Sequence, residues 1–336
     1  MKIPTPTKTA SGAYRIQLRL GGKSVTIVKE TAAECKREAI AVKADHMTGR
    51  VVQKKCTLTV SDAIDKYIAK RTKLSPSTVR GYKNIQKNIF TPVMMQVLDT
   101  VDWQTAIDAD THAPKTIRNA WGFIASVLMD NSLPVPKVRL PAVISRERPF
   151  LQPSQIPTFL AAIKGQRIEL AALLGLHSLR RSEILDVTYA DVDLKAGVIH
   201  VRGAAVVDEN NTIVHKTTNK NATSTRDVPI MIPRFTELVK QHKGAKTDYL
   251  VPLEKNTIWR DVNRICRENG LPEVGCHGLR HSFVSLAWHL KWDELSTMRV
   301  AGYADFQTMR KIYTHLAEAD KKANVQSMSA FFTNSV

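Results

Sequence analysis

Near the carboxyl end, the stretch GCHGLRHSF, residues 275–283, places two histidines and an arginine within five residues. His277 and Arg280 are three residues apart, and His281 follows the arginine directly. A guanidinium can hold a phosphate by paired hydrogen bonds, and an imidazole can move a proton near neutral pH. By itself the stretch is compatible with a metal site, a structural polar cluster or half of a centre that cleaves phosphodiester bonds.

Three other segments carry residue types suited to phosphoryl transfer. Arg180 precedes Glu183 in LRRSE, Lys220 lies in the polar stretch KTTNKNATSTRDVP, and Tyr313 lies in IYTH, ten residues after Tyr303. Each motif occurs by chance in unrelated proteins, where a tyrosine on an amphipathic helix most often packs in the core. Their combination, in this order along one chain, is much more specific than any one of them.

The charge of the chain favours a polyanionic partner. The 336 residues include 49 Lys and Arg against 31 Asp and Glu, which gives a formal net charge of +18. The basic residues concentrate in residues 1–55 and between Lys66 and Lys87, where no acidic residue occurs. Charge gathered in separate blocks indicates nucleic acid binding more than general solubility. The length predicts two or three domains.

Several other classes of protein are not expected. No apolar run approaches the ~18–20 residues of a membrane span, and the basic start MKIPTPTKTA has no apolar segment after it, so neither a membrane segment nor a signal peptide is predicted. The four cysteines form no CxxC pair and no zinc-ligand spacing, which indicates reduced thiols in a cytosol-like compartment. No cluster of Asp and Glu has the pattern of a magnesium site, so we expect neither a metal nor another cofactor.

Residues 1–55 are predicted to form a small β-rich module. Apolar residues alternate with Arg15, Gln17 and Arg19, which is typical of a half-buried strand. The pair Gly21-Gly22 predicts a hairpin turn before a return strand over 23–28, and Thr31 is a candidate N-cap for the helix that follows. The exposed Arg-Gln-Arg face suits base edges in the major groove. It is equally typical of an ordinary solvated strand face.

Helical patterns dominate residues 56–134, with helices expected over 57–73, capped by Ser61, and over 75–90 and 113–129. The last two begin with small polar and basic residues, which are good phosphate contacts, although a plain bundle with solvated charges would show the same pattern. The candidate DNA contacts here are Thr78, Arg80, Lys83, Lys115, Thr116 and Arg118. The proline-rich, basic residues 135–148 predict a linker.

Residues 149–336 are predicted to combine helices with a small antiparallel sheet. The expected strands cover 197–206, 211–218 and 225–231, with a turn at DENN, residues 208–211. Helical patterns precede and follow these strands.

In combination, LRRSE, the stretch from Lys220 to Pro229, HGLRH and IYTH resemble the tyrosine recombinase family, the phage and conjugative-element integrases. The matching run extends from about Arg148 to His315. SPSTVRGYKNI and APKTIRNAWGFIASVL look like the family's helical core-binding domain, and the N-terminal hairpin and helix are similar to its arm-binding module. The resemblance implies a mainly α multidomain protein with small β elements and a tyrosine recombinase catalytic fold. Its parts would be an arm module over 1–55, a core-binding domain over 56–134, a linker over 135–148 and a catalytic domain over 149–336.

The resemblance also implies the catalytic roles. Arg180 and Arg280 would clamp the phosphate, His277 would take a proton, and Tyr313 would be the nucleophile. Lys220 would be the general acid on a β-hairpin, with Lys216 as the competing assignment.

One position departs from the family pattern. The family usually has histidine or tryptophan at the position of Tyr303, whose hydroxyl can donate to a phosphate oxygen but cannot carry positive charge. Tyr303 is also the serious rival to Tyr313 as nucleophile. His281 is expected to be structural.

The implied function is site-specific recombination through a 3′-phosphotyrosine, which integrates or excises a phage or other mobile element. The implied partners are double-stranded DNA, at core-type and arm-type sites, and three further copies of the chain in a tetramer. Accessory DNA-bending or directionality factors are further candidates, and the expected place is the cytoplasm of a bacterial host, at the nucleoid. Two alternatives stay open: a type IB topoisomerase-like enzyme, and an inactive DNA-binding regulator with a recombinase shell.

Overall fold

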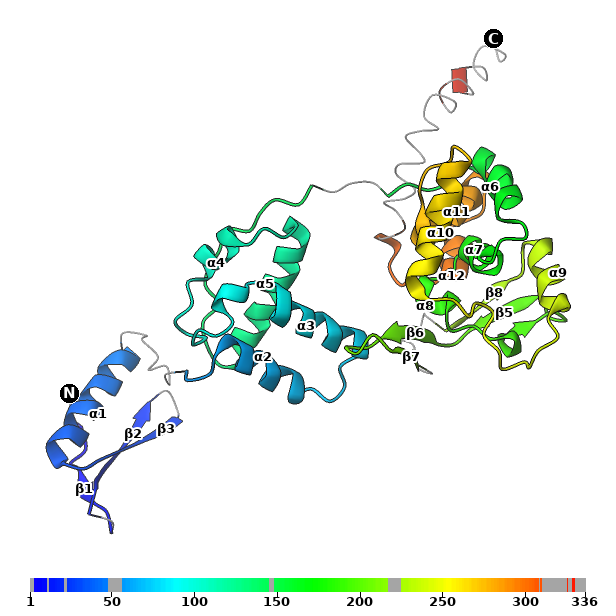
Figure 1. Ribbon diagram of the computed structural model, residues 1–336. Coiled ribbons are helices and arrows are strands. Elements are labelled where there is room, and N and C mark those ends of the chain that lie inside the picture. Colours follow the sequence, from blue (N-terminus) through cyan, green and yellow to red (C-terminus); the bar gives the residue numbers. More distant parts are fainter. Residues whose placement is uncertain are drawn as a thin grey trace. The chain divides into compact units, whose positions relative to one another are not determined.

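The computed structural model describes residues 3–10, 12–20, 23–47, 56–144, 148–216, 225–307, 309, 325 and 328–329 (Figure 1). The chain divides into two compact units. The first comprises Met1–Lys73 and Tyr82–Val143, and the second comprises Leu74–Gly81 and Ile144–Val336. Helices dominate both units and small antiparallel sheets accompany them, which confirms the predicted fold class. No helix within the described ranges is both long enough and apolar enough to cross a membrane.

The first unit begins with a small sheet covered by one helix. Its elements are β1 (Thr7–Lys8), β2 (Tyr14–Leu20), β3 (Lys23–Lys29) and α1 (Ala32–Met47). The strands are antiparallel in the order β1-β2-β3. Alternation along β2 buries Ile16 and Leu18 against Cys35 and Ala39 of α1. The hydroxyl of Thr31 accepts a hydrogen bond from the Glu34 backbone N–H at 3.2 Å, so the predicted cap and helix are confirmed. The two predicted strands pair antiparallel as expected, while Gly21 and Gly22 of the predicted turn lie outside the described residues. Strand β1 was not predicted.

The rest of the first unit is helical. Its elements are α2 (Val60–Ala69), α3 (Pro76–Asn88), η1 (Thr91–Val93), α4 (Trp103–Ala109) and α5 (Pro114–Asp130). Helix α3 is divided, because its residues up to Gly81 belong to the second unit. One apolar cluster holds α2, α4 and α5 together, with Trp103 and Ile124 in its interior. The prediction of Ser61 as the cap of α2 is wrong. Thr59 has the extended backbone of an N-cap and accepts from the Asp62 backbone N–H at 3.1 Å, while Ser61 lies inside the first turn.

The second unit surrounds its core with helices. They are η2 (Pro153–Gln155), α6 (Ile156–Ile163), α7 (Glu169–Leu176), α8 (Arg181–Ile184), η3 (Tyr189–Asp191), α9 (Pro233–Gln241), α10 (Lys255–Glu268), α11 (Gly275–His289) and α12 (Glu294–Ala301). The sequence of α7, ELAALLGL, is apolar on almost every face, as expected of a helix with protein on all sides. It lies in the main core and packs against α11. Two elements of the site, the start of α8 and the first turns of α11, are therefore held by the same central helix.

The strands of the second unit form two separate sheets. They are β4 (Val192–Asp193), β5 (Val198–Val201), β6 (Ala204–Val207), β7 (Ile213–Lys216) and β8 (Arg226–Pro229), paired in the orders β4-β5-β8 and β6-β7. The single strand predicted over 197–206 is therefore wrong, because β5 and β6 belong to different sheets. The regular strand is interrupted at Gly203. A Cβ at this position would overlap the Asp186 side chain and lie 2.5 Å from the Lys216 carbonyl oxygen. The predicted turn at 208–211 is confirmed by a hydrogen bond from the Asp208 backbone N–H to the Thr212 carbonyl at 3.0 Å.

Candidate active site

Arg180 lies at the turn between two helices of the second unit. After α7 the chain passes through Ser178 with a positive φ of 70°, and Arg180 then stands at the N-cap position of α8. The carboxylate of Glu183 accepts from the Arg180 backbone N–H at 2.7 Å and from Arg180 Nη1 at 2.7 Å. Within the LRRSE sequence, Glu183 thus holds both the backbone and the side chain of Arg180 in place.

Arg280 reaches the same turn from α11. It is one of the most deeply buried large side chains, with 1% of its surface exposed, and its Nη1 donates to the Ser178 carbonyl at 2.6 Å. The ring of Tyr303 lies against the guanidinium, 4.3 Å from its carbon. Burial lowers the pKa of Arg280. Within the described part of the chain, Arg280 Nη2 and Tyr303 Oη are both buried without a hydrogen-bond partner.

These two buried donors without a partner belong to side chains that lie against each other, the guanidinium over the tyrosine ring. A buried polar group without a partner costs on the order of 1–3 kcal/mol, and more when it is charged. Such groups persist where a ligand completes them, and a cationic donor beside a hydroxyl donor suits an anion. An oxyanion next to Arg180 would give Arg280 and Tyr303 the partner that each donor lacks among the described residues.

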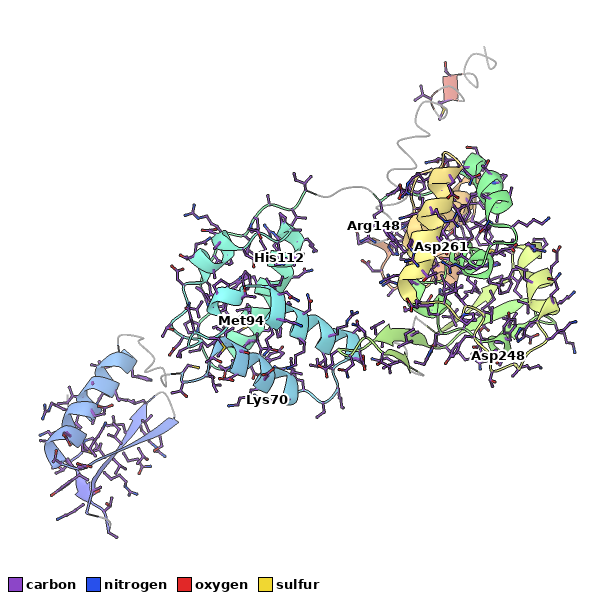
Figure 2. The ribbon with its side chains drawn as sticks, in the orientation of Figure 1. Lys70, Met94, His112, Arg148, Asp248 and Asp261 are labelled. Atoms are coloured by element: carbon purple, nitrogen blue, oxygen red, sulfur yellow. The ribbon has the colours of Figure 1, made fainter. Side chains whose placement is uncertain are left out.

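His277 and His281 lie on successive turns of α11, with ring centroids 4.5 Å apart at an interplanar angle of 80°. The pKa of His277 is lowered to about 4, first by desolvation and then by the repulsion of nearby arginines, of which Arg148 (labelled in Figure 2) is the first. Because His277 is itself exposed, the repulsion by the arginines is the firmer of these two causes. The pKa of His281 is also lowered to about 4, by desolvation and by the charges around it. Both imidazoles are neutral at pH 7. A bound phosphate would offset the arginines and raise the pKa of His277, which makes it a better proton acceptor when substrate is present.

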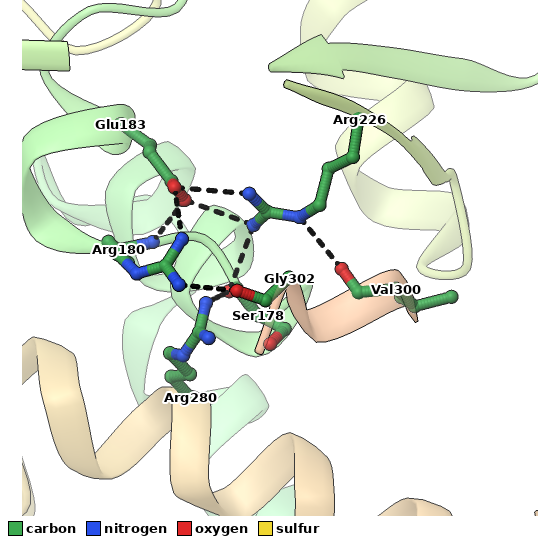
Figure 3. Close-up of polar contacts among 7 residues, drawn as sticks. All are labelled: Ser178, Arg180, Glu183, Arg226, Arg280, Val300 and Gly302. Carbon is green, nitrogen blue, oxygen red and sulfur yellow. Dashed lines mark hydrogen bonds and ion pairs between the residues drawn. The ribbon is translucent and has the colours of Figure 1, made fainter. Parts of the chain in front are cut away.

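A third arginine, Arg226 at the start of β8, completes the cluster (Figure 3). Its Nη1 and Nη2 donate to the two oxygens of Glu183, each at 3.0 Å, and its Nε donates to the Val300 carbonyl at 2.9 Å. Arg180 donates in turn to the carbonyl of Gly302, the left-handed residue that ends α12. Sequence reasoning placed Arg226 only within a motif spacing and assigned it no role, because its partner Glu183 is 43 residues away.

The structure thus brings together four of the six predicted catalytic residues, Arg180, His277, Arg280 and Tyr303, in one unit. Lys220 and Tyr313 lie outside the described residues. The competing Lys216 is the last residue of β7.

The candidate DNA contacts lie apart from this cluster in the sequence and have varied surroundings. Arg15, Gln17 and Arg19 form the exposed face of β2, as predicted. Lys83 forms an ion pair with Asp65 at 2.6 Å, and Arg118 donates to the Pro141 carbonyl at 2.8 Å, so both side chains have protein partners. The remaining candidates take these positions: Thr78 and Arg80 in the first turns of α3, and Lys115 and Thr116 in the first turn of α5.

The model of the Phage integrase family matches residues 149–320, more than half of the chain. The chain belongs to the phage integrase family. This integrase-family chain is also similar to solved structures. One is the Tn1549 transposon integrase in complex with transposon right end DNA, at 18% identity and a TM-score of 0.64, over 81% of this chain and 100% of that one. Another is a λ integrase dimer bound to a COC′ core site, at 16% identity and a TM-score of 0.53, over 92% of this chain and 94% of that one.

At such low identities, the structural similarity shows a shared fold and nothing more. No curated protein sequence matches this member of the phage integrase family. The family match confirms the resemblance inferred from LRRSE, HGLRH and IYTH, and its range contains every predicted catalytic position.

The geometry of this integrase-family site can bind and polarise a phosphodiester. Arg180 and Arg226 pair with one buried carboxylate, Glu183, and Arg280 binds the nearby Ser178 carbonyl, so these four side chains carry a net positive charge. Positioning and charge stabilisation of the phosphate oxygens are the main demands of phosphoryl transfer. Among the described residues, no three His, Cys, Asp or Glu side chains gather as metal ligands.

Proposed function

We propose that this protein is a site-specific DNA recombinase that cleaves and rejoins DNA strands through a 3′-phosphotyrosine, and so integrates or excises a mobile element. The observation that carries the proposal is a pair of buried donors, Arg280 Nη2 and Tyr303 Oη, that have no hydrogen-bond partner among the described residues, in a chain of the phage integrase family. The DNA complexes of the Tn1549 and λ integrases, which share the fold, support DNA as the partner.

Each residue has one step in the proposed reaction. Tyr313 Oη attacks the scissile phosphorus and forms the new O–P bond, while its proton passes to His277, which is neutral at pH 7. Arg180 and Arg280 bind the non-bridging oxygens, and Tyr303 adds a hydroxyl donor. The P–O5′ bond breaks, and Lys220 protonates the leaving oxygen. One phosphodiester replaces another, so a 5′-hydroxyl can reseal the strand and no nucleotide hydrolysis is required.

The assembly follows the same proposal. Residues 1–55 would bind arm-type sites through Arg15, Gln17 and Arg19, residues 56–134 and 149–336 would bind core sites, and 135–148 would link them. Four copies would act on two core sites, with accessory DNA-bending or directionality factors, at the nucleoid of a bacterial cell. The λ integrase structure solved as a tetramer bound to a Holliday junction supports this assembly.

The test is covalent trapping on DNA. The full chain is incubated with a pool of nicked duplexes of randomised core sequence, in EDTA and without ATP, and analysed on a denaturing gel beside Tyr313→Phe. A protein–DNA band that is absent in the variant is expected. A band that persists would move the nucleophile, with Tyr303→Phe tested next.

Two further results would replace the proposal. Specific binding without any covalent band would favour a DNA-binding regulator, since Tyr303 stands where the family has histidine or tryptophan. Relaxation of supercoiled DNA by a covalent mechanism, without joining of two sites, would favour a topoisomerase.

A further inference from the structure

We propose that Arg226 is a positioning residue that supplies the counter-charge of Glu183 and thereby leaves the charge of Arg180 available to the scissile phosphate. The inference rests on the proposed recombinase function and deepens it, because it assigns a role to a side chain that lies beneath the phosphate site.

The first support is the geometry of the ion pairs. Arg226 and Glu183 form a two-pronged pair, with both carboxylate oxygens bound at 3.0 Å, and their side chains are 7% and 3% exposed. Arg180 shares only one of those oxygens through its side chain, at 2.7 Å, and 35% of its side chain is exposed. The paired fork geometry is the stronger arrangement for a guanidinium and a carboxylate. Glu183 is therefore held chiefly by the buried Arg226, while Arg180, which also donates to the Gly302 carbonyl, remains partly exposed.

The second support is the charge balance. A buried carboxylate requires a cation nearby, and a lone Arg180–Glu183 pair would have no net charge with which to attract a phosphodiester. With Arg226 included, the net charge of Arg180, Glu183 and Arg226 is +1, whereas the Arg180–Glu183 pair alone has a net charge of zero. Burial by itself raises the pKa of Glu183, but the hydrogen bonds and charge of Arg226, followed by those of Arg180, outweigh it and hold that pKa below its ordinary value. Glu183 therefore stays ionised, and Arg226 provides most of the compensation.

The third support is the position of Arg226 between three segments. It begins β8, it binds Glu183 of α8, and through Nε it binds the Val300 carbonyl near the end of α12. The next turn contains Gly302, which accepts from Arg180, and Tyr303, which lies against Arg280. One buried guanidinium thus sets the spacing between the two segments that carry the phosphate donors.

The test uses covalent-complex formation on the nicked DNA, with the rate at saturating DNA and the Kd measured separately. Arg226→Met keeps the length of the side chain and removes its charge. We expect the rate to fall by about 100-fold while the Kd changes by less than about threefold, because the loss lies in the transition state. Adding Glu183→Gln to Arg226→Met removes the carboxylate that then neutralises Arg180, and should recover about tenfold of the rate.

The double variant separates the electrostatic role from a purely structural one. If Arg226 only stabilises the fold, removing a second buried hydrogen-bonding group cannot raise the cleavage rate. A double variant no faster than Arg226→Met therefore overturns the proposal. Arg226→Lys keeps the charge without the fork, and we expect it to stay within about tenfold of the wild type. This variant decides the matter if Arg226→Met does not fold, since a loss as large as about 100-fold with the charge retained contradicts the counter-charge role.

A matched control lies in the same unit. Arg234 pairs with the buried Glu169 at 2.7 Å, and within the part of the chain that the structure describes its hydrogen bonds go to Glu169 and Glu237 instead of the Arg180 cluster. Arg234→Met should lower stability and leave the cleavage rate unchanged, and an equal loss of rate in Arg234→Met and Arg226→Met would overturn the proposal. The wild type is run first. If it forms no covalent complex, the proposed function itself fails, whereas a normal wild-type rate with a normal Arg226→Met rate rejects the inference alone.

Discussion

Gly302 offers a sharp test of how tightly the site is packed. Its φ of 63° is left-handed, and a Cβ there would lie 2.8–2.9 Å from the guanidinium end of Arg226. The matched control is Gly270, which also follows a helix and has a φ of 66°, but a Cβ added there would meet nothing within 4 Å. Gly302→Ala and Gly270→Ala therefore share the backbone strain and differ in the crowding of Arg226.

The magnitudes follow from these two situations. Left-handed backbone at an alanine costs about 1 kcal/mol, and the effect of the substitution on the unfolded chain is the same at both positions. In Gly302→Ala the buried guanidinium must also move and lose a hydrogen bond to Val300 or Glu183, which adds about 2 kcal/mol. We expect Gly270→Ala to lose about 1 kcal/mol of unfolding free energy and Gly302→Ala about 3 kcal/mol.

Urea denaturation measures both losses, and covalent trapping on nicked DNA measures the effect on the site. Gly302→Ala should slow cleavage by about tenfold or more, since a displaced Arg226 disturbs Glu183 and Arg180, while Gly270→Ala should cleave like the wild type. Equal stability losses, with normal cleavage in Gly302→Ala, would refute the packing argument.

Three further outcomes are expected. Burial lowers the pKa of His177 from its ordinary 6.5 to about 4, so the unfolded state binds a proton that the folded state excludes. Stability is therefore lost as the pH falls from 6.5 towards 4, by about 2 kcal/mol at pH 5. Urea denaturation of His177→Gln should lack that loss. Tyr303→Phe keeps the ring against Arg280 but removes a buried hydroxyl that has no partner among the described residues. Unfolding free energy should therefore stay within about 1 kcal/mol of the wild type while cleavage slows about tenfold, and unchanged cleavage would mean that the hydroxyl does not meet the phosphate. DNA affinity should fall by about 1,000-fold between 50 and 200 mM salt in a fluorescence titration, and a salt-independent Kd would contradict binding through Lys and Arg contacts to phosphates.

Most of the correct predictions came from patterns within short, continuous stretches of the sequence. The alternation around Arg15, Gln17 and Arg19 predicted a strand with that exposed face, and the LRRSE and HGLRH motifs predicted Arg180, His277 and Arg280, which the structure brings into one unit. Tyr313 and Lys220 remain predictions, because they lie outside the described residues.

Long-range partners could not be predicted in this way. The pairing of Arg226 with Glu183 joins residues 43 apart, and the pairing of Arg280 with Ser178 joins residues 102 apart, so neither leaves a local period or spacing. The break at Gly203 was missed for a similar reason. The obstacle to a continuous strand is the Asp186 side chain, which only the folded chain brings there.

The Ser178 carbonyl has a consequence for how such sites change over time. Arg280 and Arg226 both donate to this one oxygen, at 2.6 and 3.5 Å, and the left-handed backbone at Ser178 forms part of the turn that carries it. A main-chain oxygen is present whatever amino acid is encoded, so the buried serine at position 178 can be replaced by glycine, which tolerates this backbone and needs no extra space, and the acceptor stays intact. Relatives can therefore keep a carbonyl oxygen that binds two arginines without having the same amino acid at this position. A comparison of side chains alone would not find this shared acceptor.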